Sequence, residues 1–402
     1  MNKPLALVVL VMLTTVGIGT FLYGAQRDRG RREGRRGTIL APLPSALPRG
    51  VTAPPNNQTT PEKVALGRLL FWDPILSGSK DVACASCHHP DFGYAENLDT
   101  SIGVNGVGLS ESRRFASPNT IPFVKRNSQT ILNTAFSGID QKNSYDPATA
   151  PMFWDIRVFS LETQALQPIK TFEEMRGNAY PENAALGTVV SRLNEIAEYR
   201  ALFAKAFGQA GNAGSVTADS IGLALAAFER SLVANHSPFD RYMRGDRNAM
   251  TQSQIQGMRS FERVGCVNCH NGPMFSDYKL HVLSVPDNPK LPASDAGATE
   301  TYAFRTASLR NLAFTAPYMH SGVFTTLRQV LRFYDDVEGG RRSENQRVGR
   351  SQLDPLLREL DVDGESRREI IDFLDALNDD SFDKTIPKRV PSGLPPGGNI
   401  AN

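Results

Sequence analysis

Apolar side chains recur at helical spacing in several separate segments, and this pattern predicts a mainly helical protein. The first segment begins after Thr60-Pro61-Glu62, a typical helix start with proline in the first turn, and continues through Leu66 and Leu70. Further segments of this kind cover residues 161–167, 185–207, 218–235, 253–264, 327–333 and 365–377. Alternating apolar and polar positions are scarce, so we expect few strands.

Three stretches outside these segments lack a helical period. Residues 91–130 and 271–316 are polar and rich in glycine, which predicts long loops. Residues 387–402 are rich in proline and glycine, and we expect them to form a disordered tail.

The N-terminal region differs from the rest of the chain. Residues 4–23 form an uncharged apolar run that is long enough to cross a bilayer as one helix. We interpret residues 1–25 as a signal anchor or a signal peptide, and favour the anchor because Tyr23-Gly24-Ala25 is a poor cleavage site. The arginine-rich and proline-rich residues 26–58 then form a flexible tether to the membrane. Arginines directly after an apolar run usually stay cytoplasmic, so the side of the membrane has to be decided by other features.

The overall charge excludes one class of partner. The chain carries 44 basic and 42 acidic side chains, which leaves a net charge of +2. Such a balance gives no support for nucleic-acid binding. A length of 402 residues suits two domains.

All four cysteines lie in two matching pentapeptides, Cys84-Ala-Ser-Cys87-His88 and Cys266-Val-Asn-Cys269-His270. Zinc ribbons place their two cysteine pairs about 15–20 residues apart, and a thioredoxin-like protein needs only one pair. Two thiols followed by histidine are the arrangement that forms thioethers to haem vinyl groups while the imidazole ligates iron. The sequence therefore predicts two covalently bound haem c groups. Because covalent haem attachment takes place outside the cytoplasm, we expect a periplasmic protein. If residues 4–23 are not cleaved off, they would anchor it to the inner membrane.

The order helix, pentapeptide, long loop and helix occurs twice. This repeat predicts two cytochrome c-like haem domains with long haem-wrapping loops, an N-terminal domain over residues 59–238 and a C-terminal domain over residues 239–386.

Histidines outside the pentapeptides are few, and this limits the choice of further iron ligands. His88 and His270 are the proximal ligands. Of the others, His281 is expected to be solvated in a loop, while for His320 a structural and a functional role are equally open. An iron with two protein ligands carries electrons, whereas an iron with an open face can bind peroxide.

At this point the chain resembles the bacterial di-haem cytochrome c peroxidases and their MauG-type relatives. The stretches that carry the resemblance lie in the expected order between residues 60 and 385: Leu66-Gly-Arg-Leu-Leu-Phe-Trp-Asp-Pro, Asn97-Leu-Asp-Thr-Ser-Ile-Gly, Arg126-Asn127-Ser128, Phe153-Trp154-Asp155 and Phe304-Arg-Thr-Ala-Ser-Leu-Arg-Asn-Leu-Ala-Phe-Thr-Ala-Pro-Tyr-Met-His320-Ser-Gly.

The resemblance assigns roles near the first haem. Family members that need reductive activation carry a blocking histidine where this chain has Val104, so the N-terminal haem is expected to be open at rest. The catalytic carboxylate falls on Glu174 and a distal amide on Gln164. A carboxylate there makes physical sense, because cleaving peroxide requires a proton to move from one oxygen to the other. Without the resemblance, Glu174 would be interpreted as a solvated acid beside Glu173.

For the second haem, the resemblance places Tyr334 as the second iron ligand, as in MauG-type enzymes. A phenolate stabilises oxidised iron, whereas a thioether stabilises reduced iron. Packing of Tyr334 in a helix, with Met319 or Met274 as the ligand instead, is the alternative. Trp154 would lie between the haems and relay an electron, or would be an ordinary core aromatic residue.

The family also binds a calcium ion between its domains. By resemblance its ligands here are Asn127, Thr315 and Pro317, whose oxygen atoms suit a hard cation. Arg305 and Arg310 are expected to bind haem propionates.

The function implied is a periplasmic di-haem peroxidase that reduces hydrogen peroxide with electrons from a small redox protein, either a cytochrome c or a cupredoxin. A MauG-like enzyme that oxidises Trp or Tyr residues of a partner protein is the main alternative, and a non-catalytic electron carrier is another. The sequence identifies neither the donor nor the oligomeric state, and a homodimer stays open.

Overall fold

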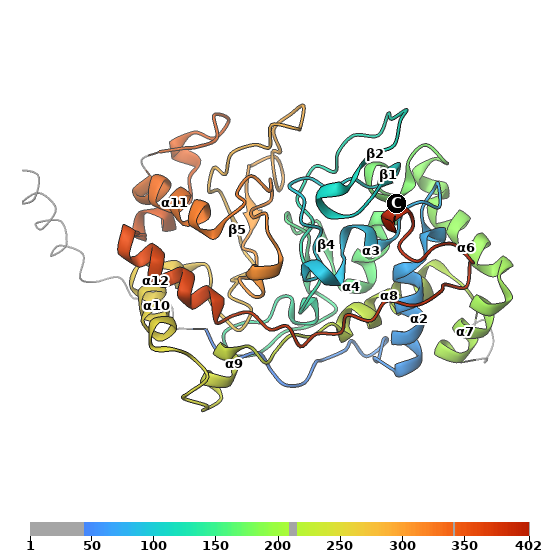
Figure 1. The fold of residues 1–402 in the computed structure, drawn as a ribbon, viewed down its shortest axis with the longest axis horizontal. Coiled ribbons are helices and arrows are strands. Elements are labelled where there is room, and N and C mark those ends of the chain that lie inside the picture. Colours follow the sequence, from blue (N-terminus) through green and yellow to red (C-terminus); the bar gives the residue numbers. More distant parts are fainter. Residues whose placement is uncertain (1–43, 209–214, 341, 402) are drawn as a thin grey trace, which may run out of the picture. The chain divides into compact units, whose positions relative to one another are not determined.

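The computed structural model describes residues 44–208, 215–340 and 342–401, and Figure 1 shows how their helices and loops are arranged. The expected membrane segment, residues 4–23, lies outside the described residues. None of the helices in the described ranges is long and apolar enough to cross a membrane.

Helices dominate the described residues, as predicted. The α-helices are α2 (Pro61–Trp72), α3 (Cys84–Cys87), α4 (Leu161–Gln164), α5 (Gln167–Lys170), α6 (Ala185–Glu195), α7 (Ala197–Phe207), α8 (Ala218–Ser231), α9 (Pro238–Met243), α10 (Gln252–Arg263), α11 (Leu327–Val337) and α12 (Gly364–Asp375). A single π-turn, η5 (Phe172–Arg176), follows α5. The short 3₁₀ turns are η1 (Pro74–Leu76), η2 (Pro90–Phe92), η3 (Ser110–Ser112), η4 (Thr134–Phe136), η6 (Glu182–Ala184), η7 (Cys266–Asn268), η8 (Leu312–Phe314), η9 (Glu338–Gly340), η10 (Arg350–Gln352), η11 (Pro355–Glu359) and η12 (Asn399–Ala401).

Strands are as scarce as the sequence predicts. Three antiparallel pairs of two-residue strands occur in the described chain: β1 (Gly106–Val107) with β2 (Arg114–Phe115), β3 (Pro151–Met152) with β4 (Val158–Phe159), and β5 (Leu280–His281) with β6 (Phe304–Arg305). Each pair joins two segments of a loop, and none of the three is part of a larger sheet.

The first cysteine motif is held by a pair of crossed helices, α2 and α8. The Thr60 side chain caps α2 by accepting a hydrogen bond from the Lys63 amide, as the helix-start signal predicts. Gly67 lets the helices touch, because a Cβ at that position would lie 2.0 Å from the carbonyl oxygen of Ala224 on α8. The apolar face of α8 is buried against this contact.

The second motif has a matching arrangement. Helices α10 and α12 cross at Gly257, where a Cβ would lie 1.9 Å from the carbonyl oxygen of Glu369. Phe261 packs edge to face on both Phe275 and Phe373 at this crossing, and the latter two rings are tilted against each other. The predicted repeat of helix, motif, loop and helix is therefore present in the fold, whereas the domain boundary at residue 238 stays a prediction.

One predicted helix is divided. Residues 185–207 form α6 and α7, separated at Ile196, which has an extended backbone conformation (φ −96°, ψ 112°). The apolar period continues across this break, so hydrophobic spacing alone did not reveal it.

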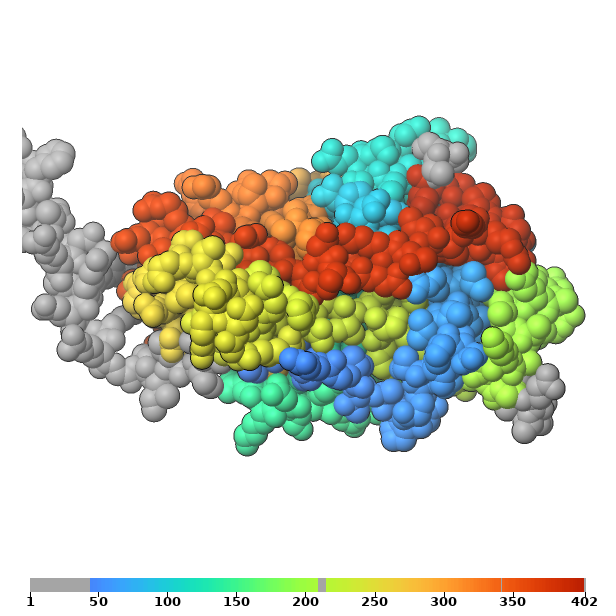
Figure 2. Space-filling view, turned by 60° about the horizontal axis from the view of Figure 1, so that its bottom comes forward, coloured from blue at the N-terminus to red at the C-terminus, as the bar shows by residue number. Residues whose placement is uncertain are grey.

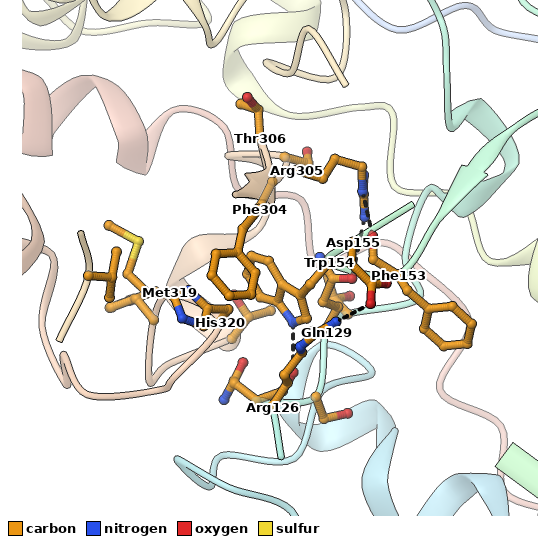
Figure 3. Close-up of a pocket in the computed structure, with 18 of the residues that line it drawn as sticks. Arg126, Gln129, Phe153, Trp154, Asp155, Phe304, Arg305, Thr306, Met319 and His320 are labelled. Carbon is orange, nitrogen blue, oxygen red and sulfur yellow. Dashed lines mark hydrogen bonds and ion pairs between the residues drawn. The ribbon is translucent and has the colours of Figure 1, made fainter. Parts of the chain in front are cut away.

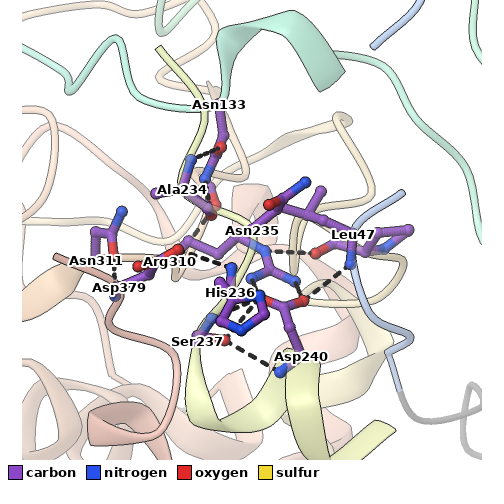
Figure 4. A network of polar contacts seen from close by, with 12 residues as sticks. Leu47, Asn133, Ala234, Asn235, His236, Ser237, Asp240, Arg310, Asn311 and Asp379 are labelled. Atoms are coloured by element: carbon purple, nitrogen blue, oxygen red, sulfur yellow. Dashed lines mark hydrogen bonds and ion pairs between the residues drawn. The ribbon is translucent and has the colours of Figure 1, made fainter. Parts of the chain in front are cut away.

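The tether prediction is wrong for residues 44–58, because this segment packs on the fold. Leu47 is buried, its amide donates to the Asp240 carboxylate over 2.9 Å, and its carbonyl accepts from Arg244 over 2.6 Å. Figure 4 shows this contact within a network that also contains Arg310. Asn57, at the far end of the segment, is fully buried.

The predicted disordered tail is also wrong for residues 387–401, which lie along the surface as an ordered strap (Figure 2). Val390 is buried, and the amide of Gly397 donates to the carbonyl of Trp72 over 2.7 Å. The Ser86 hydroxyl, inside the first cysteine motif, donates to the carbonyl of Gly397 over 2.9 Å. Prolines and glycines limit regular secondary structure here, yet the backbone finds partners on other segments.

Candidate functional site

Both cysteine motifs open into one cavity with a volume of about 580 Å³. Its wall contains the three key residues of each motif: Cys84, Cys87 and His88 of the first, and Cys266, Cys269 and His270 of the second. The structure therefore brings together two motifs that are separated by most of the sequence.

The two motif histidines have equivalent hydrogen bonds. Nδ1 of His88 lies 3.1 Å from the carbonyl oxygen of Tyr94, and Nδ1 of His270 lies 2.9 Å from that of Phe275. A ring N–H donated to a carbonyl fixes the tautomer and leaves Nε2 unprotonated, which is the state that binds iron. Burial also lowers the pKa of both imidazoles, which keeps them neutral.

The four thiols fit thioether attachment. All are free cysteines, and burial raises the pKa of Cys84 and of Cys266 to about 12. Neutral sulfur in an apolar wall suits a haem thioether better than it suits a thiolate zinc site, which needs ionised cysteines. The donor set of both motifs thus fits two haem c groups.

Glu174 lines the same cavity, as the resemblance implies. It lies in η5, and the π-turn widens the backbone so that two successive acids, Glu173 and Glu174, both reach the cavity wall. Burial, with a smaller contribution from the charge of Glu173, raises the pKa of Glu174 to about 7. The carboxyl is therefore present in both protonation states near neutral pH. Gln164, the last residue of α4, also lines the cavity.

Trp154 lies where β3 turns toward β4, in the cavity wall, and Figure 3 shows it beside His320 and Phe304. Its indole N–H donates to the carbonyl of Asn127 over 3.0 Å, and the amide of Asn127 donates to the carbonyl of His320 over 2.8 Å. The rings of Trp154 and His320 meet edge to face with centroids 6.3 Å apart.

His320 belongs to this aromatic group rather than to an exposed loop. Its ring stacks on Phe304 at 3.5 Å, and burial lowers its pKa to about 3, so it is neutral. Arg126, which lies over the Phe304 ring, forms ion pairs with Asp155 at 2.7 Å and with Asp295 at 2.5 Å. This arginine fixes the loops that hold Trp154.

The two arginines expected at the haem propionates have different positions. Arg305 lines the cavity and donates to the carbonyl of Phe153 over 2.8 Å and to Gln129. Arg310 is not one of the described residues that line the cavity. Its guanidinium forms a buried two-pronged ion pair with Asp240 at 2.8 and 3.0 Å (Figure 4). This corrects the expectation for Arg310: its guanidinium binds the carboxylate of Asp240, which also accepts a hydrogen bond from the Leu47 amide.

Tyr334, on α11, lines the cavity near the second motif, and so do Met319 and Met274. Burial is the main cause that raises the pKa of the Tyr334 phenol above its usual value. Tyr334 and Met319 pack against the same apolar cluster, whereas Met274 belongs to another. The assignment of the second iron ligand to Tyr334 stays a prediction, with Met319 or Met274 as the alternative.

The three residues expected to bind calcium, Asn127, Thr315 and Pro317, all line the cavity. The Asn127 side-chain amide donates to the carbonyl of Leu98 over 2.8 Å, which orients the residue. No group of three or more His, Cys, Asp or Glu side chains in the described ranges is arranged to hold a metal ion. A calcium site here would depend on carbonyl and amide oxygens, and it stays a prediction.

His281 is a correction. Instead of being solvated, it is buried between two carboxylates, with Nδ1 2.6 Å from Asp354 and Nε2 3.0 Å from Asp277. The sequence separation of 73 residues between His281 and Asp354 explains why no local pattern revealed this.

Among the cavity residues that the sequence analysis did not point to is Glu229 on α8. The only sequence signal was a charged pair, Glu229 and Arg230, on a helix whose other positions are mostly apolar and buried.

Comparisons with known proteins agree with this geometry. The profile of the family described as "Di-haem cytochrome c peroxidase" matches residues 61–248. A cytochrome-c peroxidase IdrP1 of Pseudomonas sp. (strain SCT) is 33% identical over 375 residues, covering 84% of this chain and 85% of that protein. The methylamine utilization protein MauG of Methylorubrum extorquens is 33% identical over 346 residues, covering 85% of each. The cytochrome c551 peroxidase of Pseudomonas aeruginosa is 32% identical over 306 residues, covering 74% of this chain and 78% of that protein.

Two solved structures share the fold. A MauG-like protein associated with microbial copper homeostasis superposes with a TM-score of 0.65 at 24% identity, over 86% of this chain and 96% of that one. The diheme peroxidase BthA from Burkholderia thailandensis superposes with a TM-score of 0.61 at 22% identity, over 89% and 98%. From the paired motifs, the shared cavity and relatives that are about one third identical over most of its length, the chain belongs to the di-haem cytochrome c peroxidase and MauG family.

Proposed function

We propose that this protein is a di-haem c peroxidase that reduces hydrogen peroxide to water at its N-terminal haem. Cys84, Cys87 and His88 hold that haem, and Cys266, Cys269 and His270 hold a second haem through which electrons enter. A haem at the first site supplies the iron that binds peroxide and passes on the electrons. The remaining chemistry belongs to the protein side chains.

The observation that carries the proposal is the buried carboxyl of Glu174 in the cavity wall, whose pKa is raised to about 7. Reduction of one peroxide consumes two electrons and two protons and yields two waters. Glu174 takes the proton from the bound peroxide oxygen and returns it to the leaving oxygen. A group whose pKa lies near the working pH does both efficiently. Gln164 lines the same cavity and orients the peroxide through its amide.

Val104 supports an open face at this haem. Val104 is buried, and its backbone amide donates a hydrogen bond to the backbone carbonyl of Glu174 over 3.0 Å. A valine offers no atom that ligates iron. A haem held by the first motif would therefore receive no protein ligand from this position.

Trp154 is proposed to relay electrons between the haems. It lies in the wall of the cavity that both motifs share, and hydrogen bonds through Asn127 fix its indole. Its edge-to-face contact with the neutral His320 ring further fixes the position of the indole.

A second candidate is oxidation of Trp or Tyr residues of a partner protein, as the MauG name of one relative suggests. Tyr334 favours it, because a tyrosine ligand at the second haem would stabilise oxidised iron. Under the first candidate the electrons come from a cytochrome c or a cupredoxin. Both candidates place the protein in the periplasm, and both accommodate a calcium ion at Asn127, Thr315 and Pro317.

The test uses the purified protein with both haems attached and oxidised. Electron paramagnetic resonance should show one high-spin haem, and hydrogen peroxide should change its spectrum without prior reduction. Absence of a high-spin signal would leave only the electron-carrier role. Turnover of peroxide with a reduced cytochrome c supports the first candidate, whereas cross-linking or hydroxylation of aromatic residues in a partner supports the second.

A further inference from the structure

A second buried acid, Glu229, lies in the cavity wall on the side of the first motif. It belongs to the last turn of α8, is 6% exposed, and shares the wall with Cys84, whose thiol pKa its charge helps to raise. The peroxide mechanism assigns no role to it. Its Oε2 atom is buried and accepts no hydrogen bond from any described residue.

Polar side chains lead from the protein surface to Arg230, the neighbour of Glu229 in the sequence. Arg230, the next residue, donates to Oε1 of Glu162 over 2.5 Å, and Asn57 donates to the same oxygen over 2.9 Å. The Asn57 amide oxygen in turn accepts from Lys63 over 3.1 Å. Lys63 and Glu162 are both partly exposed, so the series starts at solvent, and the charges of Arg230 and Glu162 both act on the Glu229 carboxyl.

The same cluster contains several buried polar atoms without a protein partner. They are Oε2 of Glu162, Oε2 of Glu229, and the Nε and one terminal nitrogen of Arg230. Native proteins rarely leave charged atoms unpaired in the interior, because each costs the full penalty of desolvation. An internal water needs two to four polar partners, and unpartnered atoms of this kind can supply them.

We propose that Glu229 is a proton-exchange site for the N-terminal haem, supplied from the surface through internal water beside Glu162 and Arg230. When a one-electron reductant reduces the haem iron, the carboxylate of Glu229 takes up one proton from solvent. When the iron is oxidised again, the carboxyl releases that proton. The charge that the electron adds to the buried site is thereby neutralised.

The surroundings of Glu229 support this coupling. In a low-dielectric interior an added electron and a nearby carboxylate repel each other strongly, and protonation removes the repulsion. Burial raises the pKa of Glu229 to about 8, although Arg230 lowers it, and Glu162 raises it further. On α2, Arg68 lies over the Phe228 ring of α8, and the pKa of Lys63 is influenced by Arg230 and Glu162. Glu174, which also lines the cavity, acts on Cys84 as Glu229 does. Cys84 is neutral once it forms a thioether. A carboxyl with this pKa changes protonation at physiological pH.

The test is a redox titration of the protein with both haems attached, at pH values from 6 to 9, and it needs no peroxide. The proposal predicts that the midpoint potential of the N-terminal haem falls as pH rises through about 8. In Glu229→Gln this dependence should shrink by about half or more, and the potential at pH 9 should rise, because a negative charge has been removed. The control Glu195→Gln changes an exposed acid and should behave as the wild type.

Two further measurements keep the result decisive. Glu174→Gln should retain most of the pH dependence, since the proton is assigned to Glu229. Proton uptake on reduction of the wild-type protein, followed with a pH indicator in weak buffer, requires no variant and covers the case in which Glu229→Gln fails to fold. No proton uptake, or an unchanged pH dependence in a folded Glu229→Gln protein, would overturn the proposal. Neither result would bear on the peroxidase function, which depends on Glu174.

Discussion

The backbone amide of Val104 donates to the backbone carbonyl of Glu174 over 3.0 Å. The loop that carries Val104 is thus tied directly to the turn that carries the proposed catalytic acid. Arg113 holds the same loop from behind, since its buried guanidinium donates to the carbonyls of Ile102, Gly103 and Gly108. The position of Glu174 therefore depends on this loop being in place.

Replacing Glu174 with Gln should lower the rate of peroxide turnover by about 10²–10⁴-fold, the usual contribution of a general acid–base group. The amide keeps the shape of the side chain but does not exchange the proton. Stopped-flow kinetics with peroxide measures the effect. Glu173→Gln is the matched control on the same turn, and an equal loss in both variants would argue against a specific role for Glu174.

The rate of peroxide binding should depend on the pH near 7. Because burial raises the pKa of Glu174 to about 7, the carboxyl is protonated below that pH and accepts no proton from peroxide. The second-order rate constant should then fall about tenfold for each pH unit below 7. The same constant measured in Glu174→Gln should be low and independent of pH. A profile with no inflection between pH 6 and 8 in the wild type would contradict the assignment.

Tyr334→Phe should change the low-spin spectrum of the second haem, because the variant keeps the aromatic ring and loses the oxygen that would ligate iron. Met319→Leu, in the same cluster, conserves volume and should leave that spectrum unaltered. Electron paramagnetic resonance of the oxidised protein records the low-spin spectrum of both variants. If only the Met319 variant alters the spectrum, the thioether is the ligand instead.

The C-terminal strap should contribute to stability. Val390→Ala removes buried methyl groups and should lower the free energy of unfolding by about 2 kcal/mol. Ile386→Ala, four residues earlier, truncates a side chain that is 45% exposed and should change stability by less than about 0.5 kcal/mol. Equilibrium unfolding in guanidinium, followed by circular dichroism, compares the two. Equal effects would mean that the strap is not packed as described.

Buried Glu96 should make stability fall as pH rises. Burial raises its pKa to about 7 despite the nearby Arg113, so between pH 4.5 and 7 the folded state binds more protons than the unfolded state. Unfolding free energy should therefore drop across this window, by about 3 kcal/mol for this group. Glu96→Gln should remove that part of the drop, while the exposed Glu111→Gln should not.

Local signals in the sequence were sufficient for the cofactors and for most helices. The two pentapeptides predicted the haem-attachment residues, which line the cavity. The capping signal at Thr60 predicted the start of α2. The resemblance added Glu174, Gln164, Trp154 and Arg305, all of which line the cavity.

What the sequence did not predict depends on contacts between distant segments. His281 is buried because Asp354 approaches it, and Arg310 is turned away from the cavity because Asp240 binds its fork. Composition indicated disorder for the strap at residues 387–401, yet its backbone is satisfied by partners such as Trp72. No period or motif encodes such pairings.

The strap also has a consequence for how the chain folds. Ser86, inside the first cysteine motif, bonds to Gly397, 311 residues later in the chain. Contacts of such long sequence separation form slowly. We therefore expect the strap to cover the first motif late in folding, after the local contacts between α2 and α3 have formed.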